Sequence, residues 1–79
     1  MTNIMEFIVY LAKALVDNPE EVSVNEVAGE RLVMYELKVN ERDLGKIIGR
    51  QGQTARSLRT LVQAVGAKQG KRVQVEILE

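Results

Sequence analysis

The chain contains no cysteine and no histidine, and only one proline. Without cysteine there is no disulfide or thiolate site, and without histidine the commonest metal ligand and general base is missing. Aromatic residues make up only 4% of the sequence, so the core must be built from Val, Leu, Ile and Ala. We therefore expect no enzyme, no catalytic residues, no metal or cofactor and no small-molecule substrate.

The chain also lacks any long hydrophobic run. No segment approaches the roughly 20 apolar residues of a membrane span. Residues 1–6 lack the basic segment followed by an apolar stretch that marks a secretory signal. A chain of 79 residues supports one domain with a thin core. We expect a single domain over residues 1–79, cytoplasmic and with no membrane insertion.

Charge is balanced overall but is divided along the chain. Residues 1–45 hold four basic and nine acidic residues, whereas residues 46–79 hold seven basic and two acidic ones. Such asymmetry favours a positive face for a polyanion and an acidic face that limits nonspecific binding. The alternative is that the charged residues only keep the surface solvated.

Hydrophobic periodicity predicts the order α-β-β-α-α-β. Apolar residues spaced by three and four indicate an N-terminal helix that Asn3 caps and that ends near Pro19. Alternating residues then predict a hairpin that turns near residues 28–30, followed by a short helix over residues 41–46 and a longer one over residues 54–65. Residues 67–71 are expected to form a loop and residues 72–78 the last strand. The fold class is α+β, a three-stranded sheet with helices on one face.

A glycine loop separates the two later helices. Gly49 and Gly52 lack a Cβ, so both can adopt positive φ and admit a ligand backbone close to the main chain. Arg50 and Gln51 lie between them and point outward. The following helix presents N–H groups and the positive end of its dipole at its first turn, which suits an anion. The implied ligand is a phosphodiester.

The order helix, glycine loop, helix, with Ile47 and Ile48 directly before Gly49, resembles a KH domain, in which this loop clamps single-stranded nucleic acid. Because a helix and a strand precede that motif, the arrangement is similar to the type II form. In this resemblance bases pack on aliphatic surface, and about four nucleotides are held. Where many KH domains carry isoleucine, Ala55 stands here, which predicts a shallower groove.

The candidate RNA-binding residues come from the loop and the helices beside it: Lys46, Ile48, Gly49, Arg50, Gln51, Gly52, Arg56 and Arg59. Ile48 is assigned to the groove and Ile47 to the core. For Arg56 and Arg59 the alternative role is ordinary helix solubility. The aromatic residues Phe7, Tyr10 and Tyr35 are expected to take part in packing.

Over the whole chain the sequence resembles small bacterial single-KH proteins of the KhpA type, through residues 43–52 and 54–60. That resemblance implies a single-stranded RNA-binding protein and RNA chaperone. It also implies a homodimer or a heterodimer with a larger KH protein of the KhpB (Jag) type, in post-transcriptional control linked to cell elongation and envelope homeostasis. Leu61, on the flank opposite the arginines, is the candidate dimer contact, and partial burial is its alternative role.

A second function class remains open at this point. A KH fold can serve mainly as a protein-interaction module that dimerises and binds nucleic acid only incidentally. A glycine loop without positive charge would favour that reading. Because Lys46, Arg50 and Arg56 surround this loop, the sequence favours RNA binding.

Overall fold

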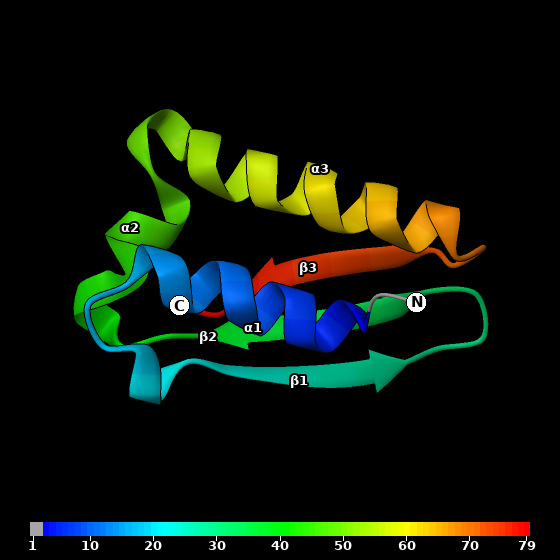
Figure 1. Cartoon of the computed structure of the whole chain (residues 1–79), viewed down its shortest axis with the longest axis horizontal. Helices are drawn as coiled ribbons and strands as arrows, with labels where there is room; N and C mark the ends of the chain where they lie inside the picture. The colour runs from blue at the N-terminus through cyan, green and yellow to red at the C-terminus, as the bar shows by residue number, and fades with distance from the viewer. Residues whose placement is uncertain (1–2) are drawn as a thin grey trace.

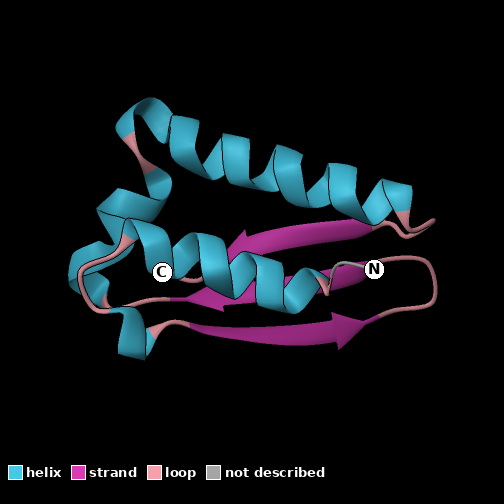
Figure 2. Cartoon of the chain, viewed as in Figure 1, coloured by secondary structure: helices cyan, strands magenta, loops and turns pink. Residues whose placement is uncertain are grey.

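The computed structural model, which describes residues 3–79, has one three-stranded sheet with the helices packed on one of its faces (Figures 1 and 2). The helices and strands follow the predicted order: α1 (Ile4–Leu15), β1 (Ser23–Ala28), β2 (Val33–Lys38), α2 (Leu44–Ile48), α3 (Gln53–Lys68) and β3 (Val73–Ile77). Short 3-10 turns occupy Pro19–Glu21, Glu41–Asp43 and Arg50–Gly52. The predicted α+β class is confirmed.

The sheet has the order β1-β2-β3, with β1 and β2 antiparallel and β2 and β3 parallel. Two parallel neighbours need a crossover connection, and α2, the glycine loop and α3 provide it. The loop therefore lies at one end of the domain, where it projects from the body of the molecule (Figure 1). This topology also leaves β3 at the edge of the sheet beside α3.

The first helix forms as the sequence predicts. The Asn3 side chain accepts a hydrogen bond from the N–H of Glu6 at 3.0 Å, and the helix ends at Leu15, ahead of Pro19. Its buried stripe is Ile4, Ile8 and Ala12.

The aromatic assignments are only partly right. Tyr35 is buried in β2 and Phe7 packs against the core. Tyr10 is 71% exposed, because it lies on the face of α1 opposite Ile8. The prediction that Tyr10 takes part in packing was therefore wrong.

The sequence prediction also ended α3 too early. We expected a loop from residue 67, but the helix continues to Lys68, and Gly66 is buried inside it. A Cβ on Gly66 would lie 2.6 Å from Val73 Cγ2. This glycine therefore does not break the helix; it lets the start of β3 approach the helix closely.

A buried carboxylate holds α2 in place. Asp43 is 1% exposed, and its oxygens accept hydrogen bonds from the N–H of Asp17 (3.2 Å), the N–H of Asn18 (3.0 Å) and the Asn18 side-chain amide (3.0 Å). Lys46 Nζ lies 3.7 Å from the same carboxylate. The segment after α1 is thus tied to the turn that starts α2, the helix that leads into the glycine loop.

These contacts also set the charge state of Asp43. Burial raises the pKa of its carboxyl, but the hydrogen bonds from Asn18 and from the backbone N–H groups, with the Lys46 ammonium, outweigh that effect. The net pKa lies below the ordinary value of a carboxyl group. The ionised form is therefore the one that the fold stabilises.

We predict that this carboxylate makes stability fall in acid. A group with a lowered folded pKa contributes its full stability above its unfolded pKa, about 3.9 for Asp, and loses it as the pH falls through the folded value. Urea denaturation should show Asp43→Asn less stable than wild type at pH 7, with the difference shrinking below about pH 4. A difference that stays constant over this pH range would contradict the assignment.

Candidate nucleic-acid interface

The glycine loop adopts a backbone that few residues other than glycine adopt. Gly49 has φ 75°, Gly52 has φ 74° and ψ 12°, and Gln51 between them has φ 55°. Among the described residues Gln51 is the one non-glycine with positive φ. Such left-handed positions are strained for a residue with a side chain, and they concentrate at functional sites. Arg50 and Gln51 are both exposed, as the sequence predicts.

The two glycines have different surroundings. A Cβ on Gly49 would lie 2.6 Å from Thr54 Cβ and 2.9 Å from the Thr54 nitrogen, so the start of α3 packs directly on this glycine. A Cβ on Gly52 would meet no heavy atom within 4 Å. Gly49 therefore closes the loop against α3, and Gly52 presents an open backbone surface. Among the described residues, no side-chain hydrogen bond caps the N-terminus of α3 at Gly52.

Adjacent isoleucines at the end of α2 point to different environments. Ile47 is fully buried and anchors the helix in the core, whereas Ile48 is partly exposed. Successive helical residues are about 100° apart, so one faces the core while the next reaches the surface. The prediction that Ile47 packs in the core is confirmed. The contact of Ile48 with RNA stays a prediction.

Ile48 forms part of an open groove of about 270 Å³ between the glycine loop, α3 and the end of β3. We call this the clamp groove; its lining residues are Ile48, Gly52, Ala55, Arg56, Arg59, Ile77 and Glu79. Ala55 is buried at its floor and contributes only a methyl group. The groove thus joins an aliphatic floor to two arginines and an open glycine backbone.

The outer edge of β3 borders this groove. The N–H of Val33 donates to the Arg72 carbonyl, and the N–H of Leu78 donates to the Leu37 carbonyl, so even-numbered residues of this segment bond toward β2. In a parallel pair, the alternate residues Val75 and Ile77 then direct their backbone groups away from β2. Arg59 Nε donates to the Val75 carbonyl at 3.3 Å, on that open edge.

Positive charge at the groove comes from α3 and the loop. In the described part of the chain both ion pairs involve Lys46, so Arg50 and Arg56 keep an unneutralised charge. The guanidinium of Arg59 donates one hydrogen bond, from Nε to the Val75 carbonyl, and its other N–H groups remain available. Arg56 and Arg59 both line the groove, whereas Arg50 is exposed on the loop and is not one of the lining residues.

Lys46 lies apart from the groove. Its ammonium nitrogen is 2.8 Å from Asp17 Oδ2 and 3.7 Å from Asp43 Oδ1. The hydrogen bond and charge of Asp17, with Asp43 behind it, raise the pKa of Lys46 above its ordinary value. Its charge is thus shared with Asp17, which follows α1, and with Asp43, which lies at the start of α2. The assignment of Lys46 to RNA stays a prediction.

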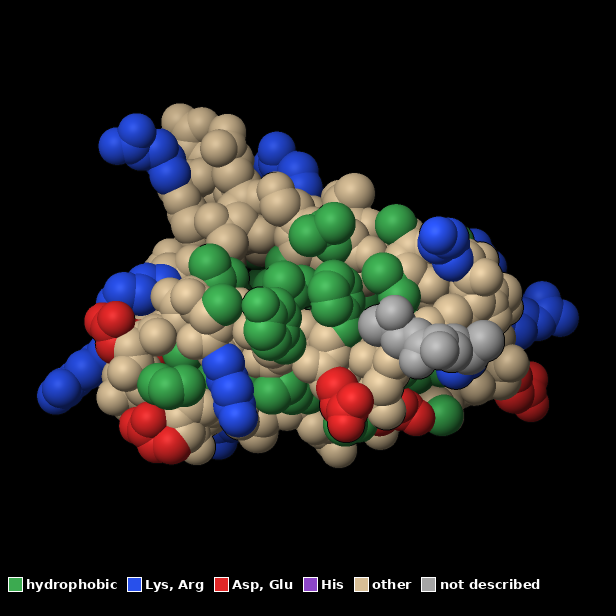
Figure 3. Space-filling view, viewed as in Figure 1, with side chains coloured by type: hydrophobic (Ala, Val, Ile, Leu, Met, Phe, Trp, Pro, Cys, Tyr) green, Lys and Arg blue, Asp and Glu red, His purple; other side chains and the backbone are tan. Residues whose placement is uncertain are grey.

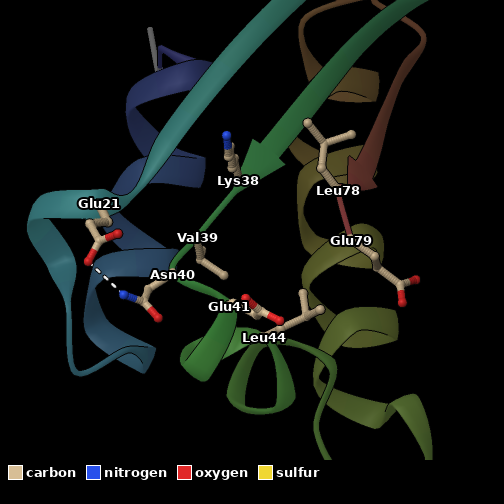
Figure 4. Close-up of a pocket in the computed structure, with 8 residues that line it drawn as sticks. All are labelled: Glu21, Lys38, Val39, Asn40, Glu41, Leu44, Leu78 and Glu79. Atoms are coloured by element: carbon tan, nitrogen blue, oxygen red, sulfur yellow. Dashed lines mark hydrogen bonds between the residues drawn. The ribbon is translucent and has the colours of Figure 1, made fainter.

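A larger hollow, of about 650 Å³, lies away from the glycine loop. Figure 4 shows it between the end of β2 and the residues after β3, with Leu44 at the start of α2. Glu21, Glu41 and Glu79 line it, and Asn40 donates to Glu21 at 2.6 Å. These three carboxylates outnumber the one cation of this hollow, Lys38, whereas in the clamp groove two arginines outnumber the single side-chain carboxylate of Glu79. The larger hollow therefore fits a nucleic acid less well than the clamp groove does.

Sequence reasoning missed three contributors to the site. Ile77 was predicted only as part of the last strand, over residues 72–78, yet it also borders the groove. Neither Asp43 nor the positive φ of Gln51 was foreseen. The alternation of apolar and polar residues predicted a strand at β3, but it does not indicate that this strand lies at the edge of the sheet beside α3.

Two helices joined by a Gly-x-x-Gly loop, inserted between parallel strands and preceded by a helix and a strand, define a type II KH domain. A family model described as KhpA/KhpB, KH domain, matches residues 5–77. The chain therefore belongs to the KhpA/KhpB KH-domain family. This family is non-enzymatic, in agreement with the sequence prediction.

Curated relatives match over nearly the whole chain. RNA-binding protein KhpA of Clostridium perfringens (strain 13 / Type A) is 51% identical over 73 residues, which cover 92% of this chain and 97% of that protein. RNA-binding protein KhpA of Aquifex aeolicus (strain VF5) is 49% identical over 79 residues, and both chains are covered completely.

Solved structures support the fold. A crystal structure of Era from Aquifex aeolicus, bound to GDP and AlF4-, matches with a TM-score of 0.69 at 20% identity, over 94% of this chain and 29% of that one. A crystal structure of Era in complex with MgGDPNP and a segment of 16S ribosomal RNA matches equally well, over 94% and 28%. At this identity the likeness shows the fold alone.

The two loop glycines predict different mutational costs. Gly52→Ala adds only the strain of positive φ and should cost about 1 kcal/mol. Gly49→Ala adds a collision with Thr54 as well and should cost about 2–4 kcal/mol. Chemical denaturation measures both. Equal costs at the two positions would contradict the different surroundings.

Proposed function

We propose that this protein binds single-stranded RNA in the clamp groove, with the RNA backbone on the Gly49–Gly52 loop. The observation that carries this proposal is the open backbone of Gly52, with Arg50 two residues before it and Arg56 on the first turns of α3. Neither arginine forms an ion pair with any residue that the structure describes. A phosphate can approach Gly52 closely, Arg50 and Arg56 supply its countercharge, and the uncapped N-terminus of α3 points its dipole at the anion. The KhpA names of the relatives support RNA as the polyanion.

The bases would lie in the same groove. Ile48 and Ala55 offer an aliphatic surface for a base face, and the outward backbone of Ile77 offers hydrogen bonds to a base edge. Arg59 donates a hydrogen bond to the Val75 carbonyl. Breaking that bond would make the Arg59 guanidinium available to a phosphate and the Val75 carbonyl available as an acceptor for a base edge. Because Ala55 is small and no aromatic lines the groove, stacking is weak and affinity depends mainly on phosphate contacts.

A charge reversal in the loop tests this function. Arg50→Asp/Gln51→Asp places two carboxylates where a phosphate would lie and leaves both glycines in place. We predict that binding of a labelled oligouridylate, measured by fluorescence anisotropy, falls on the order of a hundredfold or more, because a phosphate contact is lost and a repulsion is added. Circular dichroism should show an unchanged fold.

The matched control is Lys13→Asp/Lys38→Asp, on α1 and at the end of β2. It changes the net charge by more than the loop variant does, but outside the groove. Binding should stay within a few-fold of wild type, since exposed charges beyond a Debye length of about 8 Å are screened. If both variants lose binding equally, or neither does, the clamp is not the site, and the interaction-module reading is favoured.

We also propose that two copies associate through the face between α1 and α3. Hydrophobic side chains gather on this face (Figure 3), and Leu61 of α3 is 50% exposed on the flank opposite Arg59. Leu15, at the end of α1, is also exposed. A dimer would place two clamps on one RNA and raise affinity through avidity, as weak single sites require.

The family resemblance extends this proposal to an RNA chaperone in the cytoplasm, acting as a homodimer or with a larger KH protein of the KhpB (Jag) type. Two weak, rapidly exchanging clamps suit a chaperone, because they hold single strands without trapping them. The link to cell elongation and envelope homeostasis rests on the resemblance alone. Cell length after deletion of the gene is the measurement that tests it.

Leu61 gives the dimer proposal a direct test. Leu61→Asp places a charge in the apolar contact and should convert a dimer to a monomer in sedimentation equilibrium. Avidity would be lost with it, so affinity for an RNA that spans two clamps should fall on the order of a hundredfold, with little change for a single-site oligonucleotide. The control is Thr60→Asp, one residue away on the exposed face of α3. An unchanged mass for Leu61→Asp rules this interface out.

A further inference from the structure

The clamp groove continues along the seam between α3 and the open edge of β3. A second hollow of about 240 Å³, which we call the distal hollow, is lined by Leu32, Gln63, Arg72, Val73 and Gln74. The helix contributes Arg56 and Arg59 to the clamp groove and Gln63 to the distal hollow, at a spacing of three and four that forms one helical stripe.

The opposite side of the seam is formed by β3, whose residue numbers fall in the direction in which those of α3 rise. Ile77 lies in the clamp groove, Val75 accepts the hydrogen bond from Arg59, and Val73 lies in the distal hollow. The clamp groove and the distal hollow therefore lie one after the other along the seam between α3 and β3, and the Arg59–Val75 hydrogen bond lies between them. From Arg56 to Gln63 the helix rises about 10 Å, at about 1.5 Å per residue.

The distal hollow has the chemistry of a nucleic-acid contact. No carboxylate lines it, and Arg72 is exposed with no ion-pair partner among the described residues. Gln63 and Gln74 are exposed, and each amide carries both donors and an acceptor, which suit base edges. Lys71 is exposed beside Arg72 and adds positive charge.

We propose that an RNA strand held by the clamp continues along the open edge of β3 into the distal hollow. There Arg72 contacts a phosphate, and Gln63 and Gln74 contact a base. This inference rests on the proposed function, and it makes the RNA footprint of one domain longer than the clamp alone. Charge complementarity and continuity with the clamp groove favour RNA over a protein segment as the occupant.

The test compares two labelled oligouridylates, one of about four nucleotides, the length of a KH clamp, and one twice as long. Arg72→Gln should weaken binding of the longer RNA on the order of tenfold, as expected for a lost charge-assisted hydrogen bond, and leave the shorter one unchanged. The slope of log affinity against log salt for the longer RNA should shrink by about 0.7, the value for one phosphate contact on a single strand. Gln63→Ala should weaken the longer RNA only.

The matched control is Lys13→Gln on α1, which removes one positive charge away from the seam and should change neither RNA. Equal effects of Arg72→Gln on the two lengths, or no effect on either, would overturn the distal contact. The clamp is judged separately. If the shorter RNA binds Arg50→Asp/Gln51→Asp as well as wild type, or binds wild type not at all, the proposed function fails and the distal contact fails with it.

Discussion

The buried carboxylate of Asp43 is the contact on which the geometry of this site depends. A buried charge is tolerated only when it is hydrogen-bonded and paired, and here backbone and side-chain N–H groups of Asp17 and Asn18, with the ammonium of Lys46, meet that requirement. The contact fixes the direction in which α2 leaves the sheet. That direction buries Ile47 and turns the loop outward.

What the loop can do follows from its neighbours. Gly49 closes against Thr54, so the path into α3 is set by packing, while the open backbone of Gly52 faces the groove. The crossover topology leaves β3 at the sheet edge, so its outward backbone groups border the same groove. A phosphate surface and a base-edge surface are thereby placed side by side. Neither requires a catalytic group or a metal.

Much of the fold was predictable because local signals agreed with it. The Asn3 cap, the alternation in β3 and the glycine spacing each reflect short-range physics. The end of α3 was predicted too early because glycines usually lie where a helix stops, and only the close approach of Val73 to Gly66 shows why this glycine lies inside the helix. The pairing of Lys46 with Asp17 joins residues far apart in the chain and has no local signature. The motif predicted the candidate residues, but it did not show that Arg56 and Arg59 line the groove while Lys46 lies outside it.

The central claim is that RNA lies between the glycine loop and the open edge of β3. Backbone amide chemical-shift mapping by NMR, on the intact chain titrated with an oligouridylate, tests it most directly. The account predicts that the largest shifts fall on the amides of Gly49, Gly52 and Ile77. Shifts confined to the face between α1 and α3, around Leu61, would contradict it and would make that face the primary binding surface.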